Sequence, residues 1–520
     1  MISEAALRAK GRAVVRHAGA QVLLIASERG LFACANRCPH EGYPLSEGVL
    51  TEGCLLTCNW HNWKFDLVGG RTLVGGDVLR RYPVKAEDGQ VLVDFSPEDP
   101  EARRARAVAG MLRAMAEEDQ ARIVREAARQ MRLGADLALP LTAAIGWAAE
   151  RLEFGTGHAI AGGVEWLGLA ERRSVGADRQ LAALGEILGH LADEARGGAR
   201  LYPFPEGQRA WNAGQFLAAV EAEDEPGAIA LIRGALAEGL TPGALMPVLA
   251  RAALGHYADF GHSLIYAVKT CALAERLGPE AAGPLLLMLT RSLIYATRED
   301  LLPEFRTYAQ RLGEWGKARR AAPPLAPEAV TGRSAREAMA IVAAWSEREP
   351  PTAILATLIE GGAWMLLHAD ERVFTSAEGK LRDNVNWLDF THTLTFAAAG
   401  GEAARRDADL MPAVLLQLAC FIGRNAGFID RALETEAFAI ADAGAFAAAA
   451  RERIFDHGLE RFIVSVHLLK TLNAGLQLAR VYPAAAPTIL AAVNRFLHAP
   501  FKRRHVLRTA RQMRAFVAME

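Results

Sequence analysis

The chain has 520 residues and a formal net charge of −1, with 51% hydrophobic and 23% charged residues. This balance gives no electrostatic reason to expect a nucleic acid or an anionic membrane as a partner. No apolar run suggests a membrane span, the start MISEAALRAKGRAVVRH has no signal-peptide core, and six cysteines do not make a disulfide framework, so we expect a cytoplasmic protein.

Residues 8–95 alternate short apolar runs with turn residues. Runs such as QVLLIAS, LFACAN and QVLVDF are separated by glycine, aspartate and asparagine. Pairs such as Gly69-Gly70 and Asp88-Gly89 are typical of tight turns. The pattern predicts a small antiparallel β domain.

Two loops in this region carry the residues of a metal centre. Cys38 and His40 stand in CPHEGYPLSEG, and Cys58 and His61 stand in CNWHNWKFDLVGG. Two thiolates and two imidazoles can hold either a Rieske [2Fe–2S] cluster or a zinc ion, and the spacing alone allows both. Both loops resemble those of Rieske ferredoxins, and this resemblance implies a [2Fe–2S] cluster held by these four residues.

The same resemblance implies a cluster of the ferredoxin and oxygenase type. High-potential Rieske proteins carry an additional cysteine in each loop, where this chain has Tyr43 and Trp60. Cys34 and Cys54 each stand four residues before a ligand cysteine. We expect them to be buried thiols on strands rather than a disulfide.

The period of the sequence changes at residues 95–106, FSPEDPEARRAR, where two prolines are followed by charged residues. From there to the C-terminus, Ala, Leu, Arg and Glu recur at helical spacing, with a proline-rich interruption at 321–327. We therefore predict an α+β multidomain protein. A small antiparallel β Rieske domain at 1–96 precedes a large all-α domain of repeated helical hairpins, in two halves at 107–318 and 334–520.

Familiar ring-hydroxylating Rieske oxygenases bind mononuclear iron with an Asp/Asn-x-x-His-x₃₋₄-His run in a mixed α/β domain. This sequence has no such run, so the resemblance ends with the β domain. It also has no P-loop and no Gly-x-Gly-x-x-Gly opening a βαβ unit. We therefore expect a separate NAD(P)H-dependent reductase or a ferredoxin to supply the electrons.

The helical region contains a duplicated motif. The segments 257–267 and 387–397 both read aromatic-x-Asp-Phe-x-His-x-Leu-x-aromatic-Ala. Weaker echoes surround His158 and His467, and a strongly apolar helical segment follows each of the four. The pattern predicts four helical hairpins, each with a histidine early in its first helix, that assemble into a bundle or solenoid.

An aspartate and a histidine three residues apart lie on one face of a helix. Di-iron bundle proteins bind metal in this way, with Glu-x-x-His motifs on two helices. The duplicated motif supplies the analogous catalytic ligands, which are Asp259, His262, Asp389 and His392.

Further histidines could complete this metal site, namely His158, His256 and His467, with His368 as another candidate. The opposite interpretation is that these are core histidines. An aspartate three residues before a histidine is often only the hydrogen-bond partner that fixes its tautomer.

The helical region also distantly resembles the questin-oxidase-like family of helical, oxygen-dependent enzymes. The likeness rests on the histidine-bearing segments DFTHTLTFAAA and FIVSVHLLKT. It implies oxygen-dependent chemistry, and no residue role is carried over from it.

These features predict an iron-dependent oxidoreductase, namely a mono- or dioxygenase that uses O₂. The Rieske centre would feed single electrons to a non-haem iron site, mononuclear or di-iron, which oxidises a small, largely apolar substrate. The alternative is an electron-transfer or redox-sensing protein whose helical domain is a partner-binding scaffold. A third arrangement places haem between the helices, with His262 or His392 as its axial ligand. A homo-oligomer is compatible with all three.

Overall fold

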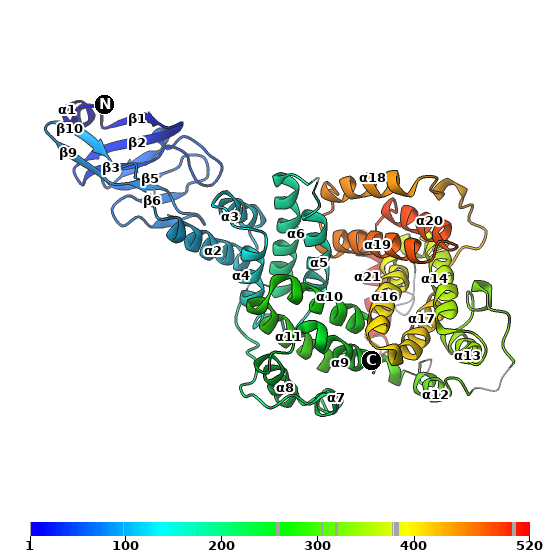
Figure 1. Ribbon diagram of the computed structural model, residues 1–520. Helices are drawn as coiled ribbons and strands as arrows, with labels where there is room; N and C mark the ends of the chain where they lie inside the picture. Colours follow the sequence, from blue (N-terminus) through cyan, green and yellow to red (C-terminus); the bar gives the residue numbers. More distant parts are fainter. Residues whose placement is uncertain are drawn as a thin grey trace. The chain divides into compact units, whose positions relative to one another are not determined.

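The computed structural model describes residues 2–519, except 97, 174, 197, 256–259, 303–304, 318–320, 377, 379–383 and 502–505. The chain forms two compact units (Figure 1). The N-terminal unit comprises Met1–Ala114 and Ala121–Gly134, and the helical unit comprises Met115–Gln120 and Ala135–Glu520. The predicted fold class, small antiparallel sheets followed by a large helical region, is confirmed.

Short strands make up three antiparallel sheets in the described part of the N-terminal unit. Their orders are β1-β2-β3-β8, β4-β5-β6-β7 and β10-β9. The strands are β1 Arg12–His17, β2 Ala20–Ser27, β3 Gly30–Ala35, β4 Val49–Thr51, β5 Leu55–Thr57, β6 Lys64–Asp66, β7 Thr72–Val74, β8 Arg81–Tyr82, β9 Val84–Glu87 and β10 Gln90–Val93.

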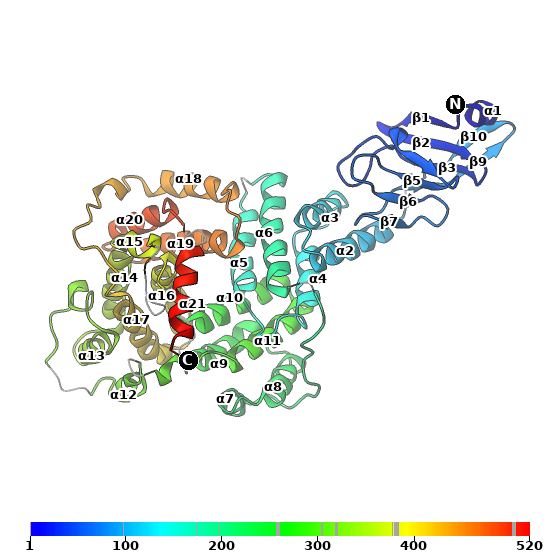
Figure 2. The same cartoon turned by 180° about the vertical axis from the view of Figure 1, so that it is seen from behind.

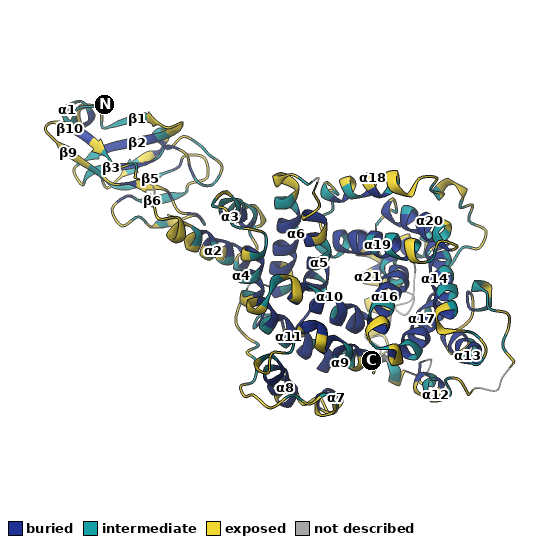
Figure 3. Ribbon diagram, in the orientation of Figure 1, coloured by how far each residue is buried: buried dark blue, intermediate teal, exposed yellow. Residues whose placement is uncertain are grey.

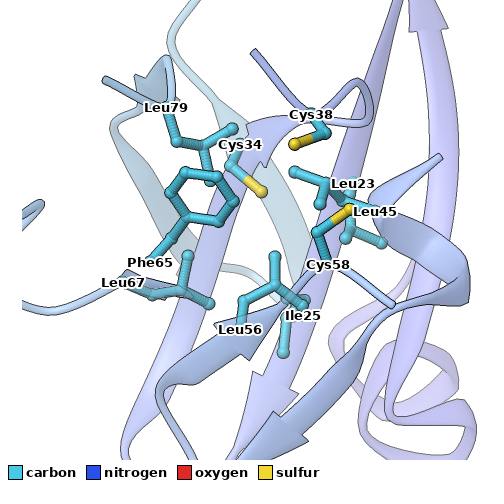
Figure 4. Packing of buried hydrophobic residues seen from close by; sticks show 10 residues of the cluster. All are labelled: Leu23, Ile25, Cys34, Cys38, Leu45, Leu56, Cys58, Phe65, Leu67 and Leu79. Carbon is cyan, nitrogen blue, oxygen red and sulfur yellow. The ribbon is translucent and has the colours of Figure 1, made fainter. Parts of the chain in front are cut away.

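Strands β1 and β3 pair with the two edges of the central strand β2. Both faces of β2 are buried, because a hydrophobic cluster covers each of them. Successive side chains of a strand point to opposite faces. Leu23 and Ile25 therefore join the cluster that contains Cys38 and Cys58, which Figure 4 shows. The neighbouring residues of the strand join the other cluster. The two loops thus rest on a well-packed base.

Three helices also belong largely to the N-terminal unit, namely α1 Glu4–Lys10, α2 Pro100–Ala116 and α3 Gln120–Arg132. We predicted that the β domain ends at residue 96, but this unit continues to Gly134. The reason is a set of ion pairs between α3 and the buried carboxylate of Asp77. Ion pairs between residues far apart in the sequence do not change the spacing of apolar residues, so this spacing could not predict them.

The helical unit consists of helices joined by loops and 3₁₀ turns (Figures 1 and 2). Its α-helices are α4 Ala138–Ala148, α5 His158–Ala170, α6 Ala177–Ala195, α7 Ala213–Glu221, α8 Glu225–Ala237, α9 Pro242–Ala253, α10 His262–Leu277, α11 Pro279–Ile294, α12 Thr307–Gly313, α13 Ala335–Trp345, α14 Pro351–Leu367, α15 Glu371–Thr375, α16 Trp387–Arg406, α17 Met411–Asn425, α18 Ala443–Phe455, α19 Phe462–Val481, α20 Ala486–Leu497 and α21 Val506–Val517.

The four predicted helical hairpins are present. Helix α5 packs on α6, α10 on α11, α16 on α17, and α19 on α20. The four first helices also pack on one another in a closed cycle, α5 on α10, α10 on α16, α16 on α19, and α19 on α5. Because this cycle joins hairpins from both predicted halves, residues 107–318 and 334–520, the two halves share one compact unit from Ala135 onward.

Helix α19 is long and apolar enough to cross a membrane by length and composition, although the sequence led us to expect no membrane span. Most of its apolar window, 61%, is buried inside the protein (Figure 3). It packs against α5, α16 and α20. A position at the centre of a helical core accounts for its composition without a membrane.

Candidate metal centres

The first centre lies in the N-terminal unit, where two loops bring two thiols and two imidazoles together. Cys38 and Cys58 are 3% and 1% exposed. The Nδ1 atoms of His40 and His61 lie 3.1 Å apart, and both rings are partly exposed. Burial, together with the neighbouring thiol of Cys58, raises the pKa of Cys38 to about 11. A metal at this place would favour the thiolate form.

The two loops have the same backbone hydrogen bonds. In the first, the Cys38 N–H donates to the Tyr43 carbonyl at 2.9 Å, and the Gly42 N–H donates to the Cys38 carbonyl at 2.8 Å. In the second, the Cys58 N–H donates to the Trp63 carbonyl at 2.8 Å, and the Asn62 N–H donates to the Cys58 carbonyl at 3.0 Å. Gly42 and Asn62 both have positive φ, 79° and 59°, which these two residue types tolerate best.

Aromatic rings cover both histidines. The Trp63 ring stacks on His40 with centroids 4.7 Å apart, and the Trp60 ring stacks on His61 at 5.2 Å. Trp60 is 57% exposed, so the imidazole end of the centre is close to the surface of its unit. The thiol end is buried in the hydrophobic cluster.

Helix α3 holds the first loop from outside the two-loop motif. Arg125 donates to the carbonyls of Pro39 and His40 at 2.6 and 2.8 Å and pairs with Asp77 at 3.2 Å. Arg129 donates to both oxygens of Asp77, at 3.0 and 2.8 Å. Burial alone would raise the pKa of Asp77, but Arg129 and Arg125 hold it below its usual value. The guanidinium of Arg125 therefore lies beside a ligand-bearing loop.

A family model described as a Rieske [2Fe–2S] domain matches residues 2–76. The biphenyl dioxygenase ferredoxin subunit of Pseudomonas sp. (strain KKS102) is 32% identical to this chain over 84 residues, which cover 16% of this chain and 77% of that protein. The chain belongs to the Rieske [2Fe–2S] family. The Rieske domain lies within the N-terminal unit and accounts for the two-loop centre.

Two further relatives are similar to a short part of the chain. The ferredoxin component of the alkene monooxygenase system of Xanthobacter autotrophicus (strain ATCC BAA-1158 / Py2) is 38% identical over 78 residues, 15% of this chain and 64% of that protein. The 4beta-methylsterol monooxygenase of Methylococcus capsulatus (strain ATCC 33009 / NCIMB 11132 / Bath) is 40% identical over 98 residues, 16% of this chain and 26% of that protein. The chain thus spans less than two thirds of both.

The residues of the centre fit a Rieske cluster, in which one iron takes two thiolates and the other takes two imidazoles. The two buried sulfurs and the two converging Nδ1 atoms supply these two kinds of ligand. The remaining cysteines of the domain are free. Cys34 is buried on β3, where burial raises its pKa to about 12, whereas Cys54 is partly buried in the turn before β5 rather than on a strand.

Removing the guanidinium of Arg125 tests what helix α3 adds to the Rieske domain. We expect Arg125→Met to retain the cluster, to lower its reduction potential because a nearby positive charge is lost, and to destabilise the N-terminal unit by about 2 kcal/mol. A redox titration and thermal unfolding of the holoprotein measure the two effects. Arg113→Met, an exposed arginine on α2, is the control, and equal results for both variants would contradict the prediction.

The second centre lies at the middle of the helical unit, where each hairpin contributes one histidine. His158 and His262 are the first residues of α5 and α10, and His392 and His467 lie in the second turns of α16 and α19. One nitrogen from each of the four rings lies within 4.8 Å of all the others. The Nε2 of His262 lies 3.0 Å from the Nε2 atoms of both His158 and His392.

Hydrogen bonds fix the tautomers of two of these histidines. The Nδ1–H groups of His392 and His467 donate to the carbonyls of Leu388 and Ile463, each four residues earlier, at 2.6 Å. The Nε2 atoms of both rings therefore carry lone pairs toward the centre. The buried Nε2 of His467 has no hydrogen-bond partner among the described residues. A metal ion would satisfy this atom and use the lone pairs.

The environment also keeps these rings neutral. Burial lowers the pKa values of His392 and His467 well below the usual value for histidine, and the charge of Lys470 lowers them further. Neutral imidazole is the form that binds metal. Four neutral nitrogen donors within 4.8 Å of one another fit a single metal ion.

Asp389, a predicted metal ligand, closes a capping box at the start of α16. Its carboxylate accepts the N–H of Asn386 at 2.7 Å, and Asn386 in turn caps the first turn of α16. Asp389 stands at the third position of the helix, where a carboxylate closes a capping box. It is absent from the group of four histidines. Asp259 and His256, also predicted as ligands, lie outside the described residues.

His368 lies apart from the four-histidine group. Its Nδ1–H donates to the Trp364 carbonyl at 2.9 Å, and its ring stacks on Trp364. The haem arrangement, with His262 or His392 as the axial ligand, stays a prediction. The Nε2 atoms of these two residues are 3.0 Å apart, so the two rings cannot bind the opposite faces of one haem.

Sequence reasoning missed two polar residues next to the four histidines. The Tyr266 hydroxyl lies 3.1 Å from Nδ1 of His158. Lys470 follows His467 by three residues on α19 and is buried. A lysine inside the apolar run SVHLLKTL, on the same helical face as a candidate ligand, was the available signal.

Proposed function

We propose that this chain is an O₂-using oxidoreductase with two metal centres. Its Rieske cluster, held by Cys38, His40, Cys58 and His61, would deliver single electrons, and an iron ion held by four histidines would use them. The observation that carries the proposal is the convergence of four imidazole nitrogens in the same chain as a Rieske domain. The ligands of the helical site are His158, His262, His392 and His467.

Iron at the helical site would supply one-electron redox chemistry and an affinity for O₂. The chain's own residues prepare the place. The carbonyls of Leu388 and Ile463 hold two rings in the metal-binding tautomer, and burial excludes water from the donor atoms. The Tyr266 hydroxyl is placed to fix the ring of His158. Such pre-orientation is what second-shell partners contribute to a metal site.

We propose one iron ion rather than two. Di-iron bundle sites need bridging carboxylates, whereas the grouped ligands of the described helical unit are all histidines. A small, largely apolar substrate and a separate reductase or ferredoxin remain part of the proposal. The names of two relatives, the ferredoxin component of an alkene monooxygenase system and a 4beta-methylsterol monooxygenase, support a role of the Rieske domain in oxygenase chemistry.

A second candidate function is electron transfer without substrate oxidation. Two of the relatives are named as a ferredoxin component and a ferredoxin subunit, and this favours the alternative. In that case the four histidines would be structural, and the helical unit would bind a partner.

Metal analysis separates the two functions. Protein purified without oxygen is analysed for iron, other metals and acid-labile sulfide, then reduced chemically and exposed to O₂. The Rieske cluster alone accounts for about two irons and two sulfides. The oxidoreductase requires about one additional iron per chain and O₂ consumption that depends on it. Two irons, even after incubation with Fe(II), would instead establish the electron carrier.

A further inference from the structure

Lys470 is a buried lysine whose ammonium forms no hydrogen bond within the described part of the chain. Its residue is 2% exposed, and its Nζ has no hydrogen-bond acceptor among the described residues. A buried ammonium without a hydrogen bond or counter-ion is costly to folding. On α19 it lies one turn after His467, on the same helical face. The ammonium is therefore carried on the same helical face as His467, one of the four histidines.

Two carboxylates, those of Glu165 and Glu194, act on the charge of Lys470, but neither forms an ion pair with it. Glu165 pairs with Lys269 at 2.7 Å and accepts from Asn473 at 2.7 Å. Glu194 accepts the Ala159 N–H at the start of α5 through Oε1 at 3.1 Å, whereas its buried Oε2 has no hydrogen-bond partner among the described residues. Burial lowers the pKa of Lys470 to about 8, although Glu165 and Glu194 raise it. A carboxylate bound beside Nζ would favour the charged ammonium.

The charges around the helical site do not balance once a metal is present. The four imidazoles are neutral donors, and the group contains no carboxylate. A divalent ion there would keep its full charge, and the ammonium of Lys470 would add another in a setting that screens charge weakly. Sites that bind a metal with carboxylates cancel part of this charge within the protein. Glu194, which acts on the charge of Lys470, can cancel at most one of these positive charges, so the remainder has to come from a ligand.

We propose that the metal ion of the four-histidine site and the ammonium of Lys470 together bind a small carboxylate. A carboxylate has two oxygens on one carbon, so one can bind the metal while the other accepts a hydrogen bond from Nζ. This inference rests on the proposed function and deepens it, because the carboxylate would be the anionic end of an otherwise apolar substrate. Lys470 is thus a substrate-binding residue.

The test measures binding of acetate to full-length protein whose helical site is loaded with Co(II). The visible absorption of the cobalt reports the anion directly. Wild type is expected to bind acetate, and Lys470→Met is expected to bind it at least tenfold more weakly while retaining the cobalt. The matched control is Thr471→Val, which removes a buried hydroxyl without a partner from the adjacent position.

Thermal unfolding of the metal-free variants distinguishes a binding role from a structural one. Loss of an unpartnered ammonium should leave the melting temperature of Lys470→Met unchanged or higher, whereas loss of a structural ion pair would lower it. Lys470→Gln, which keeps a polar side chain, is the second variant if the methionine variant does not fold. Equal acetate affinity in wild type and the Lys470 variants, or no acetate binding by cobalt-loaded wild type, would overturn the inference alone. Failure of wild type to bind cobalt or iron would overturn the proposed function as well.

Discussion

Replacing His392 with alanine is expected to abolish metal binding by the helical unit and to leave the Rieske absorption spectrum unchanged. The Nε2 of His392 lies 3.0 Å from that of His262. Its Nδ1–H donates to the Leu388 carbonyl, so the lone pair that this ring can offer to a metal is on Nε2, which faces the other histidines. Three nitrogens would remain with a cavity in place of the fourth. We expect the metal affinity to fall by more than about 100-fold, because even the loss of an outer-shell partner costs up to that much.

Metal analysis after Fe(II) reconstitution, together with the visible spectrum, measures both parts of this result. His368→Ala is the matched control, because His368 also donates Nδ1–H to a carbonyl four residues earlier but lies outside the group. Circular dichroism of the His392 variant checks that the helices persist. If His392→Ala and His368→Ala retain the same metal content and O₂ consumption, the four histidines are core residues.

Replacing Cys58 with alanine is expected to remove the Rieske cluster and to leave the helical unit folded and able to bind metal. Cys58 is 1% exposed and supplies one of the two buried sulfurs of the centre. Because the N-terminal and helical units have separate cores, the loss of the cluster should not destabilise the helical unit. The variant should lose about two irons and two sulfides per chain while keeping the iron of the helical site.

Iron and sulfide analysis and circular dichroism at the helical wavelength test this variant. Cys54→Ala is its control, since Cys54 stands four residues earlier and is a free, partly buried thiol. That control should keep the complete cluster. Loss of helical content in Cys58→Ala would show that the two units do not fold independently, and loss of all iron would remove the support for a second site.

The Rieske centre was predictable from sequence because each half of it is a local structure. All the ligands lie in two short loops whose backbone hydrogen bonds join residues four or five positions apart. The four-histidine group was predictable for a different reason. The duplicated motif placed a histidine early in the first helix of each hairpin, and hairpins that pack in the same way bring equivalent positions together.

The role of Asp389 could not be settled from sequence, because an aspartate three residues before a histidine fits two structures equally well. The competing signal was present in the sequence, since Asn386 and Asp389 have the spacing of a capping box. The missing partner of Lys470 could not be predicted from sequence. It depends on where Glu165 and Lys269 meet in the folded bundle. The end of the N-terminal unit also could not be predicted from sequence, because it depends on ion pairs that form only in the folded chain, between Asp77 and α3.

The four histidines lie far apart along the chain, between residues 158 and 467, and each belongs to a different hairpin. An unfolded chain cannot present them together, so a metal bound there would act as a cross-link that only the native state can form. At a free metal concentration 100-fold above the dissociation constant, this linkage adds about 2.7 kcal/mol to the free energy of unfolding. The stability of the helical unit would then depend on the free metal concentration around it. A chelator would lower its melting temperature without any change in the covalent structure of the chain.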